Sequence, residues 1–303
     1  MNKPKIFIDG QAGTTGLEIY TRLSKREDIE LLIIPEEKRK DNETRSHLMD
    51  QADLVFLCLP DAAAKEAVTL VSNPDTKIID ASTAHRTSPG WIYGLPELSQ
   101  ARKQAIRTGK RVANPGCHAT GFITVVYPLV QAGILSVKEA IHCFSLTGYS
   151  GGGKRMIADY QQSDRPFTYS APGIYGLTMQ HKHIKEMQAV CHLEKAPLFS
   201  PIVDDYYRGM ATSIQLEADV DQIRQIYRDF YTSGLITVAD SWQGNVYANM
   251  WADRDSLEIV VNGNENQTIV TALFDNLGKG ACGAAIQNMN IMLGFDEKEG
   301  LIV

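Results

Sequence analysis

The residue best suited to covalent chemistry is a cysteine, Cys117, which lies where a predicted strand ends and a predicted helix begins. Residues 110–113 form the predicted strand, and the Pro-Gly pair before Cys117 would end it. The apolar run at 122–130 predicts a buried helix that Pro128 would kink. Cys117 would then lie at the helix N-terminus, where unpaired N–H groups favour an anion and lower the pKa of a thiol. Local context leaves two interpretations open, a nucleophilic thiolate and a buried structural cysteine.

A second chemical signal is a pair of histidines, His181 and His183, at the start of a predicted helix around residues 180–187. Imidazole titrates near neutral pH, which suits acid–base catalysis. Two other interpretations remain, a metal site and a helix start without a role. No third His, Cys or acidic cluster lies near in sequence, so we expect no bound metal.

These groups need an element to hold a substrate or cofactor, and the first candidate is a glycine loop near the N-terminus. A predicted strand at 5–9 runs into this loop, and a helix is predicted at 16–25. Glycines let the backbone approach a pyrophosphate, and the helix N-terminus attracts its charge. A tight turn without a ligand is the alternative. The loop residues assigned to the cofactor are Gly10, Gly13, Thr14, Thr15 and Gly16.

The end of the second predicted strand, at 30–34, carries charges of both signs. An acidic residue there would hold a ribose 2′-hydroxyl, and a basic one a 2′-phosphate. The basic run of Lys38, Arg39 and Lys40 favours NADP, whereas a solvated loop of mixed charge is the alternative.

Strands and helices go on alternating up to the cysteine. The nearly continuous apolar run at 52–59 predicts a strand buried on both faces, as parallel sheets require. We expect a helix at 61–71, a strand at 77–80 and a helix at 99–108. The loop after the strand at 77–80 would line the ligand crevice. This order predicts a doubly wound α/β domain.

After the cysteine helix, the pattern changes to that of a second, α+β unit. Strands are predicted at 140–146, 198–203, 209–216, 257–262 and 267–274, with a helix at 220–231. Between them, three consecutive glycines lie between Ser150 and the cations Lys154 and Arg155. Such a stretch forms either an anion-binding nest or a mobile linker. The final stretch 276–293 contains Gly278-Lys279-Gly280 and then a helical pattern.

Composition limits the class of protein. The 303 residues carry a net charge of −6, which disfavours nucleic acid or an anionic membrane as the main partner. No run approaches the roughly 18 apolar residues of a membrane helix, and we expect no signal peptide. The five cysteines are an odd number without CxxC spacing, so we expect neither disulfides nor a zinc site, and a cytoplasmic location.

Taken together, the motifs resemble one known family over nearly the whole chain. They are the glycine loop, Asn114–Cys117, Ser150–Lys154, His181–His183 and the C-terminal motif that contains Asn276, Lys279 and Asn288. This order is similar to that of N-acetyl-γ-glutamyl-phosphate reductase, an arginine-biosynthesis enzyme related to aspartate-semialdehyde dehydrogenase. The length of the chain is similar to that of the shorter subfamily. Two positions depart from the longer form: His118 replaces an aromatic residue, and Lys154 ends the glycine loop.

The resemblance implies NADP-linked reduction of an acyl phosphate to an aldehyde. Cys117 would attack the acyl group and expel phosphate, and hydride would then collapse the thioester. A histidine would help to form the thiolate and to protonate the departing group. We favour His183 narrowly over His181 for this role and rank His118 third, because it would point away from Cys117.

The same resemblance completes the expected site and its organisation. Residues 1–114, completed by a C-terminal helix at 279–303, would form the NADP-binding Rossmann domain. Residues 115–278 would form an α+β catalytic domain of the semialdehyde-dehydrogenase type in a homo-oligomer, a dimer or a tetramer. Ser82, Asn276 and Asn288 are further cofactor candidates. The substrate candidates are Asn114, Ser150, Gly151, Lys154, Arg86 and Arg208. Two alternative functions remain: reduction of aspartyl phosphate or a carrier-linked aminoadipyl phosphate, and non-catalytic dinucleotide sensing.

Overall fold

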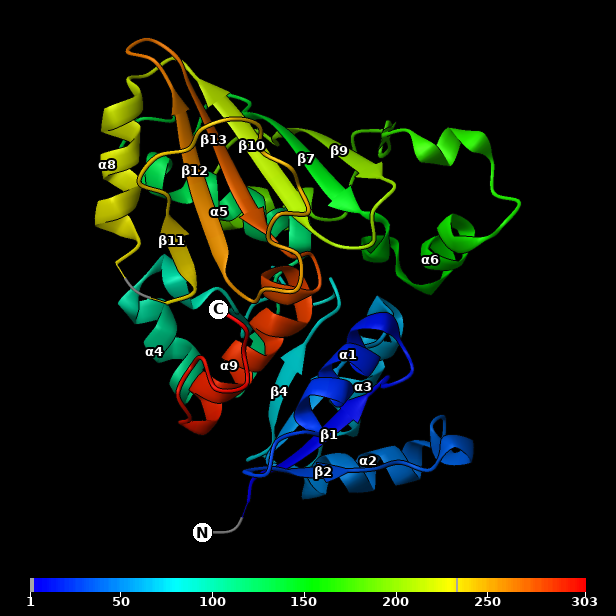
Figure 1. Cartoon of the computed structure of the whole chain (residues 1–303). Helices are drawn as coiled ribbons and strands as arrows, with labels where there is room; N and C mark the ends of the chain where they lie inside the picture. Colours follow the sequence, from blue (N-terminus) through cyan, green and yellow to red (C-terminus); the bar gives the residue numbers. More distant parts are fainter. Residues whose placement is uncertain (1–2, 233) are drawn as a thin grey trace. The chain divides into compact units, whose positions relative to one another are not determined.

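The computed structural model describes residues 3–232 and 234–303. It divides the chain into two compact units, each with a sheet of its own (Figure 1). The first unit runs to Pro115 and also includes Ala281–Leu301. The second unit comprises Gly116–Gly280 together with the last two residues, Ile302–Val303.

The first unit is built on a parallel sheet of six strands in the order β2-β1-β3-β4-β6-β5. Its strands are β1 (Lys5–Asp9), β2 (Glu30–Leu32), β3 (Leu54–Leu57), β4 (Lys77–Asp80), β5 (Ile92–Tyr93) and β6 (Arg111–Ala113). All four residues of β3 are buried, as expected for a strand covered by helices on both faces. The doubly wound α/β architecture predicted from the sequence is confirmed.

Helices connect these strands and cover the sheet. They are α1 (Thr14–Leu23), α2 (Asn42–Gln51), α3 (Asp61–Leu70), α4 (Gln100–Thr108) and α9 (Gly283–Leu293), with short 3-10 turns at Glu36–Lys38 and Pro96–Leu98. The sequence analysis missed α2, because its only buried residues are Arg45 and Met49. A weak start signal was present: Asp41 caps the helix by accepting a hydrogen bond from the Thr44 N–H at 3.1 Å.

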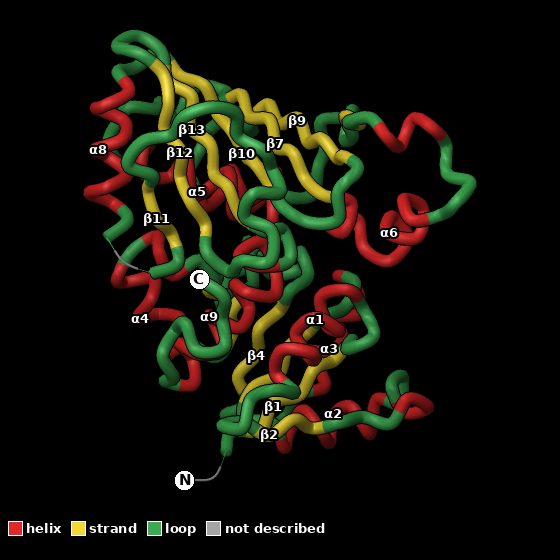
Figure 2. The backbone as a smooth tube through the Cα atoms, viewed as in Figure 1, coloured by secondary structure: helices red, strands yellow, loops and turns green. Residues whose placement is uncertain are grey.

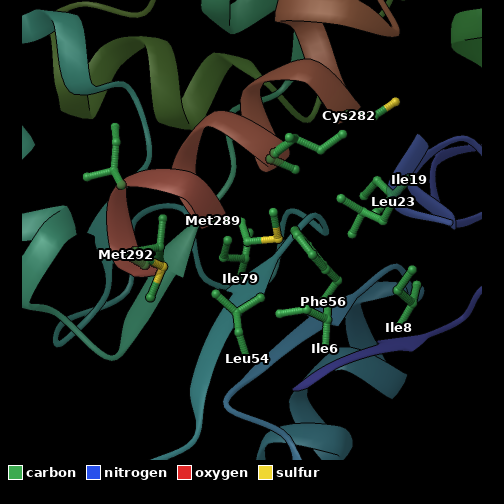
Figure 3. Close-up of a cluster of buried hydrophobic side chains, with 14 of the residues drawn as sticks. Ile6, Ile8, Ile19, Leu23, Leu54, Phe56, Ile79, Cys282, Met289 and Met292 are labelled. Carbon is green, nitrogen blue, oxygen red and sulfur yellow. The ribbon is translucent and has the colours of Figure 1, made fainter. Parts of the chain in front are cut away.

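The C-terminal helix α9 is part of the core of the first unit. Met289 and Met292 of α9 pack in one cluster with Phe56 of β3 and Ile79 of β4 (Figure 3). The C-terminal helix expected at 279–303 is shorter in the structure: a π-helix at Gly278–Cys282 leads into α9, which ends at Leu293.

The second unit is built on a mixed sheet of seven strands in the order β11-β12-β13-β10-β7-β9-β8 (Figures 1 and 2). Its strands are β7 (His142–Gly148), β8 (Gly173–Ile174), β9 (Leu198–Asp204), β10 (Met210–Leu216), β11 (Ile236–Val238), β12 (Leu257–Gly263) and β13 (Thr268–Phe274). The pairs β7–β9 and β11–β12 are parallel, and the others are antiparallel. The predicted α+β class is confirmed, although β8 and β11 were missed.

The helices of this unit are α5 (Cys117–Gln131), α6 (Gly153–Gln161), α7 (Ile184–Val190) and α8 (Val220–Phe230), with 3-10 turns at Tyr149–Gly152 and Phe167–Ser170. Helix α5 packs on β10 and β13 and against α7 and α8. A Cβ on Gly121 would lie 2.4 Å from Thr212 Oγ1, so only glycine lets α5 approach β10 this closely.

Pro128 lies inside α5 and has no N–H to offer the carbonyl of Thr124 four residues earlier. The hydroxyl of Tyr231 donates to that carbonyl at 2.9 Å. A side chain from beyond α8 therefore satisfies the acceptor that proline leaves unpaired, and the helix continues past Pro128.

Candidate active site

Cys117 is the first residue of α5, as the sequence predicts. Gly116 precedes it as the N-cap and has no side chain with which to cap the first turn. The amide groups of that turn therefore face the position of the thiol, where they favour an anion. This location meets the requirement for a nucleophilic thiolate.

The other cysteines lie in environments that keep a thiol protonated. Cys117 is half-buried, whereas Cys143, Cys191 and Cys282 are buried. Burial raises the pKa of Cys143 and Cys191. Burial, together with the charges of Asp80 and Asp9, raises the pKa of Cys58 to about 12. The environment of these three thiols is that of inert cysteines.

Helix α7 meets the start of α5 through a residue that the sequence analysis overlooked. The Gly116 N–H donates to Oε2 of Glu186 at 3.1 Å, and Glu186 is buried. Glu186 follows His183 by three positions, so the two residues share one face of the helix start. That spacing was a signal available in the sequence.

The two predicted histidines lie in the same region. His183 is the buried N-cap of α7, and its N–H donates to Nδ1 of His181 at 3.2 Å. The His181 and His183 rings are 4.8 Å apart, edge to face. The ring of His118, next to Cys117 in the chain, lies 5.4 Å from that of His181 and 5.9 Å from that of His183. The structure thus gathers three imidazoles beside the start of α5.

Burial keeps at least two of these imidazoles neutral at physiological pH. Desolvation, with a further contribution from His181 and Lys182, lowers the pKa of His118 to about 3. Desolvation and then Lys182 lower the pKa of His181 to about 4. A neutral imidazole has a lone pair that can accept a proton, but the lowered pKa makes each of these two rings a weaker base towards a thiol.

The glycine stretch after β7 forms a 3-10 turn that leads into α6, and the residues just before the glycines are anchored. The N–H groups of Tyr149 and Ser150 donate to the carbonyls of Tyr206 and Tyr207 at 2.9 and 3.0 Å. A Cβ on Gly148 would lie 2.6 Å from the Tyr207 carbonyl oxygen, so the two segments pack closely.

The residues predicted along this turn differ in exposure. Ser150 is buried, and its Oγ accepts a hydrogen bond from Nδ2 of Asn276 at 2.8 Å. Gly151 and Lys154 are exposed. Asn276, assigned above to the cofactor, also accepts from the Gly209 N–H at 2.9 Å and so holds two loops of the second unit together.

Arg208 is already engaged by two acids. Its guanidinium lies 2.6 Å from Oδ1 of Asp253 and 3.4 Å from Oδ2 of Asp275. Burial raises the pKa of Asp275, and the charge of Arg208 counteracts this shift. The binding of a substrate carboxylate by Arg208 stays a prediction.

The glycine loop of the first unit has the close contacts that a dinucleotide fingerprint needs. Gly10 has a φ of +87°, and a Cβ there would lie 2.3 Å from the Cys58 carbonyl oxygen. A Cβ on Gly16 would lie 2.4 Å from the Gly10 carbonyl oxygen. Gly13 caps α1, so Thr14 and Thr15 form its first turn, two residues earlier than predicted. These residues fit a pyrophosphate at the start of α1.

The basic residues after β2 are mostly free to reach a ligand. Lys38 and Lys40 are exposed, whereas Arg39 is half-buried and lies 3.3 Å from Oε1 of Glu36. A 2′-phosphate needs cationic partners, and the two lysines offer them.

The remaining candidates of the first unit belong to two hydrogen-bond networks. Ser82 donates to Oδ2 of the buried Asp80 at 2.8 Å. The Arg86 guanidinium donates to the Asn114 carbonyl at 2.9 Å. Nδ2 of Asn288 donates to the Gly94 carbonyl at 2.9 Å and to Oδ1 of Asn114 at 3.2 Å. The structure thus brings Arg86, Asn114 and Asn288 together.

Two further properties of the described residues bear on other kinds of site. None of the described helices is long and apolar enough to cross a membrane. Within the same residues, no group of three or more His, Cys, Asp or Glu side chains is arranged to hold a metal ion.

Family models match both units. The model described as "Semialdehyde dehydrogenase, NAD binding domain" matches residues 35–106, and "Semialdehyde dehydrogenase, dimerisation domain" matches residues 117–276. Among solved structures, aspartate semialdehyde dehydrogenase II from Vibrio cholerae has a TM-score of 0.74 at 14% identity, covering 97% of this chain and 99% of that one. The Candida albicans enzyme with NADP has a TM-score of 0.67 at 14% identity, over 96% and 99% of the two chains. These structures share the fold.

Two curated relatives are much closer in sequence. N-acetyl-gamma-glutamyl-phosphate reductase 2 of a Nostoc species is 43% identical over 327 aligned positions, which cover 99% of this chain and 100% of the relative. The protein of the same name from Pseudomonas putida is 40% identical over 318 positions, with the same coverage. This chain therefore belongs to the N-acetyl-gamma-glutamyl-phosphate reductases, within the semialdehyde dehydrogenase family.

Proposed function

We propose that the protein reduces N-acetyl-glutamyl 5-phosphate to N-acetyl-glutamate 5-semialdehyde and releases phosphate, reversibly and with NADPH, in arginine biosynthesis. The observation that carries the proposal is the position of Cys117, half-buried at the start of α5 and beside a cluster of imidazoles. An acyl phosphate needs a strong nucleophile that is also a good leaving group, and a thiolate is both. The relatives are named for this substrate.

Cys117 forms a thioester in the first step. Its thiolate attacks the acyl carbon, a C–S bond forms, and the C–O bond to phosphate breaks with its electron pair leaving on phosphate. Amides of the first turn of α5 stabilise both the thiolate and the oxyanion of the tetrahedral intermediate. A nicotinamide dinucleotide held at the glycine loop of the first unit would supply the hydride that reduces the thioester, and breakage of the C–S bond would return the Cys117 thiolate.

A histidine of the cluster moves the proton. His183 remains our assignment, because it caps α7 one turn before Glu186, whose carboxylate binds the start of α5. A neutral imidazole takes the thiol proton and later protonates the departing oxygen. His181 is the second candidate, and desolvation lowers its pKa to about 4.

Anion binding is assigned to the turn that carries Ser150, Gly151 and Lys154. The turn is held rigid by backbone hydrogen bonds, which suits a site for phosphate. Lys154 is exposed and brings a positive charge that can move to an incoming phosphate. Asn114 for the oxyanion and Arg86 or Arg208 for a substrate carboxylate complete the proposed set.

The cofactor is a nicotinamide dinucleotide, and we assign NADP. Gly10, Gly13 and Gly16 leave room for the pyrophosphate, and the exposed Lys38 offers a charge to a 2′-phosphate. A homo-oligomer assembled through the second unit is proposed on the description of the matched dimerisation domain. A cytoplasmic location is proposed because the cysteines are free thiols, which suits a reducing compartment.

Assay in the reverse direction tests this function. The purified protein is given phosphate and NADP with each of three substrates: N-acetyl-glutamate semialdehyde, aspartate semialdehyde and a carrier-linked aminoadipate semialdehyde. We expect turnover of the first alone, faster with NADP than with NAD. Preference for another semialdehyde would reassign the substrate, and dinucleotide binding without any turnover would favour a sensor.

The matched variants in that assay are Cys117→Ser and Cys143→Ala. The first should lose turnover by several powers of ten while it still binds NADP, since serine forms no comparable anion near neutral pH. The second removes a buried thiol of the same unit and should keep turnover. More than about a tenth of wild-type activity in Cys117→Ser would exclude the thioester route.

A further inference from the structure

A chain of four polar side chains runs from the sheet of the second unit to the edge of the cysteine site. Thr212 Oγ1 and Ser145 Oγ are 2.7 Å apart, and Ser145 Oγ is 2.8 Å from Nδ1 of His118. Nε2 of His118 is 2.6 Å from the hydroxyl of Tyr175. Thr212, Ser145 and His118 are buried, so the hydrogen bonds among them are protected from water.

Both ends of this chain are fixed. Thr212 lies on β10 and Ser145 on β7, which are neighbouring strands in register at these two positions. His118 is held from behind by Ser145 and packs edge to face on Phe199, with ring centroids 5.2 Å apart. Its ring therefore has little freedom, and it fixes the hydroxyl of the half-buried Tyr175.

Tyr175 is joined to the residue next to Cys117, because its hydroxyl lies 2.6 Å from Nε2 of His118 near the start of α5. Burial raises the pKa of Tyr175, and the charge of Cys117 raises it further. The phenol is therefore a neutral hydrogen-bond donor at every working pH. A donor close to a thiolate stabilises that anion.

We propose that His118 and Tyr175 are positioning residues, in which His118 orients the Tyr175 hydroxyl so that its proton is directed to the Cys117 thiolate. This inference rests on the proposed function, because it assigns Cys117 as the nucleophile. A neutral imidazole has one donor and one acceptor nitrogen. When Ser145 donates to Nδ1, the Nε2–H donates to the Tyr175 oxygen and leaves the phenol proton for the thiolate. The negative charge of the Cys117 thiolate favours this arrangement, because the thiolate can accept the phenol proton.

Tyr175→Phe removes only the hydroxyl and tests the inference. We expect the pKa of the Cys117 thiol to rise by about one unit, which is the tenfold effect of losing one hydrogen bond to a charged group. The readout is alkylation of Cys117 by iodoacetamide, followed by mass spectrometry across pH. Alkylation should slow about tenfold near neutral pH and be unchanged on the high-pH plateau, since the thiolate itself is intact.

The His118→Phe variant separates two roles of this ring: the orientation of the Tyr175 hydroxyl and the packing against neighbouring rings. Phenylalanine keeps an aromatic ring beside Phe199, His181 and His183 but cannot bond Tyr175. Because the two residues act as one unit, the double variant should lose no more than either single variant. In turnover, kcat should fall about tenfold in each case while the KM for NADP stays unchanged.

The control is Tyr160→Phe, the same change on a buried ring that stacks between Tyr149 and Tyr169 in the same unit. It should leave the thiol pKa unaltered. The other ionisable groups near the start of α5 are the same in all variants: His181, Lys182, His183, Glu186 and Lys279. Circular dichroism melts confirm that each variant is folded.

Two results would overturn the inference: a Cys117 pKa in Tyr175→Phe equal to that of wild type, and losses in the double variant that multiply those of the singles. Alkylation needs no acyl phosphate, so these results are independent of the substrate. If wild type shows a reactive thiolate but no turnover of any semialdehyde, the proposed function fails while the positioning role is still measured.

Discussion

At the scale of single residues, the second unit buries titratable side chains, whose charged forms are destabilised by desolvation. His118 is the clearest case. Its side chain is buried, and its two ring nitrogens are hydrogen-bonded to the hydroxyls of Ser145 and Tyr175. Desolvation lowers the pKa of His118 to about 3. An unfolded histidine has a pKa near 6.5. The difference ties the stability of the fold to pH.

We predict that stability falls as the pH drops below about 6.5. Between that value and the folded pKa of about 3, the unfolded chain binds a proton that folded His118 excludes. Neutral His118 therefore has no pH-dependent effect on the free energy of unfolding above about pH 6.5. Below about pH 6.5, the free energy of unfolding falls by up to about 1.4 kcal/mol per pH unit. Urea unfolding of wild type and His118→Phe at about pH 7.5 and 5 measures it. The variant should lose less stability than wild type over this interval, and equal slopes would refute the prediction.

The candidate site residues that could be predicted from the sequence are those whose residue type and sequence position already indicate a chemical role. Cys117 and the two histidines were found because a thiol at a helix start and an imidazole pair are unusual. Ser145 and Tyr175 were missed, since their importance comes only from strand register and from the path of the chain after β8. Glu186 lay between these cases: its spacing from His183 was visible, but its bond to Gly116 was not.

At the scale of elements, Gly280 in the π-helix at Gly278–Cys282 determines how closely the chain approaches Cys117, the proposed nucleophile. A Cβ on Gly280 would lie 2.9 Å from the Cβ of Cys117 and 3.0 Å from the Asp275 carbonyl oxygen. Contacts this short between well-packed atoms cannot be absorbed without movement. Glycine at this position lets the π-helix pack directly on the start of α5.

Gly280→Ala should therefore displace Cys117 and lower kcat by roughly tenfold to a hundredfold, because misplacement of about 1 Å has an effect of that size. Affinity for the dinucleotide, measured by fluorescence titration, should change little. Gly173→Ala is the matched control, since a Cβ there would meet Val203 Cγ1 at an ordinary 3.8 Å. Unchanged turnover in Gly280→Ala would show that the contact is relieved elsewhere.

Elements with a regular apolar pattern were predictable, and those held by polar contacts were not. Strand β13 and helix α8 lie within one residue of their predicted ends. Helix α2 was missed because it packs through Arg45, which pairs with the buried Asp9 at 2.7 Å instead of presenting an apolar stripe. Strand β11 has only three residues and gains its place by pairing with β12.

At the scale of the whole molecule, the second unit has exposed apolar side chains around its edge strand β8, and we propose that a second copy of the chain covers them. Phe199 and Ser145 lie on the side of the sheet that faces α5. Strand register places Ile174, Ile202 and Leu146 on the opposite side. Ile174 is 62% exposed there, on the edge strand β8, whose open side can pair with another chain.

The segment around β8 has the composition of an interface. Residues 166–180 contain no Asp, Glu, Lys or Arg. Its exposed apolar side chains are Phe167, Ile174, Leu177 and Met179. Depletion of charge with enrichment in aromatic residues and methionine is typical of protein–protein contacts. The matched dimerisation domain, residues 117–276, includes the whole segment, and we propose a second copy of the chain as the occupant.

Ile174→Glu should therefore weaken self-association. A charge at the centre of an apolar contact is desolvated without a partner, whereas the same side chain is harmless in a monomer because the position is exposed. Light scattering after gel filtration should give wild type a multiple of the 33.5 kDa chain mass and shift the variant towards that mass. Ile33→Glu, at a 55% exposed isoleucine of the first unit, is the control and should keep the wild-type mass. If Ile33→Glu dissociated the assembly and Ile174→Glu did not, the interface would belong to the first unit instead.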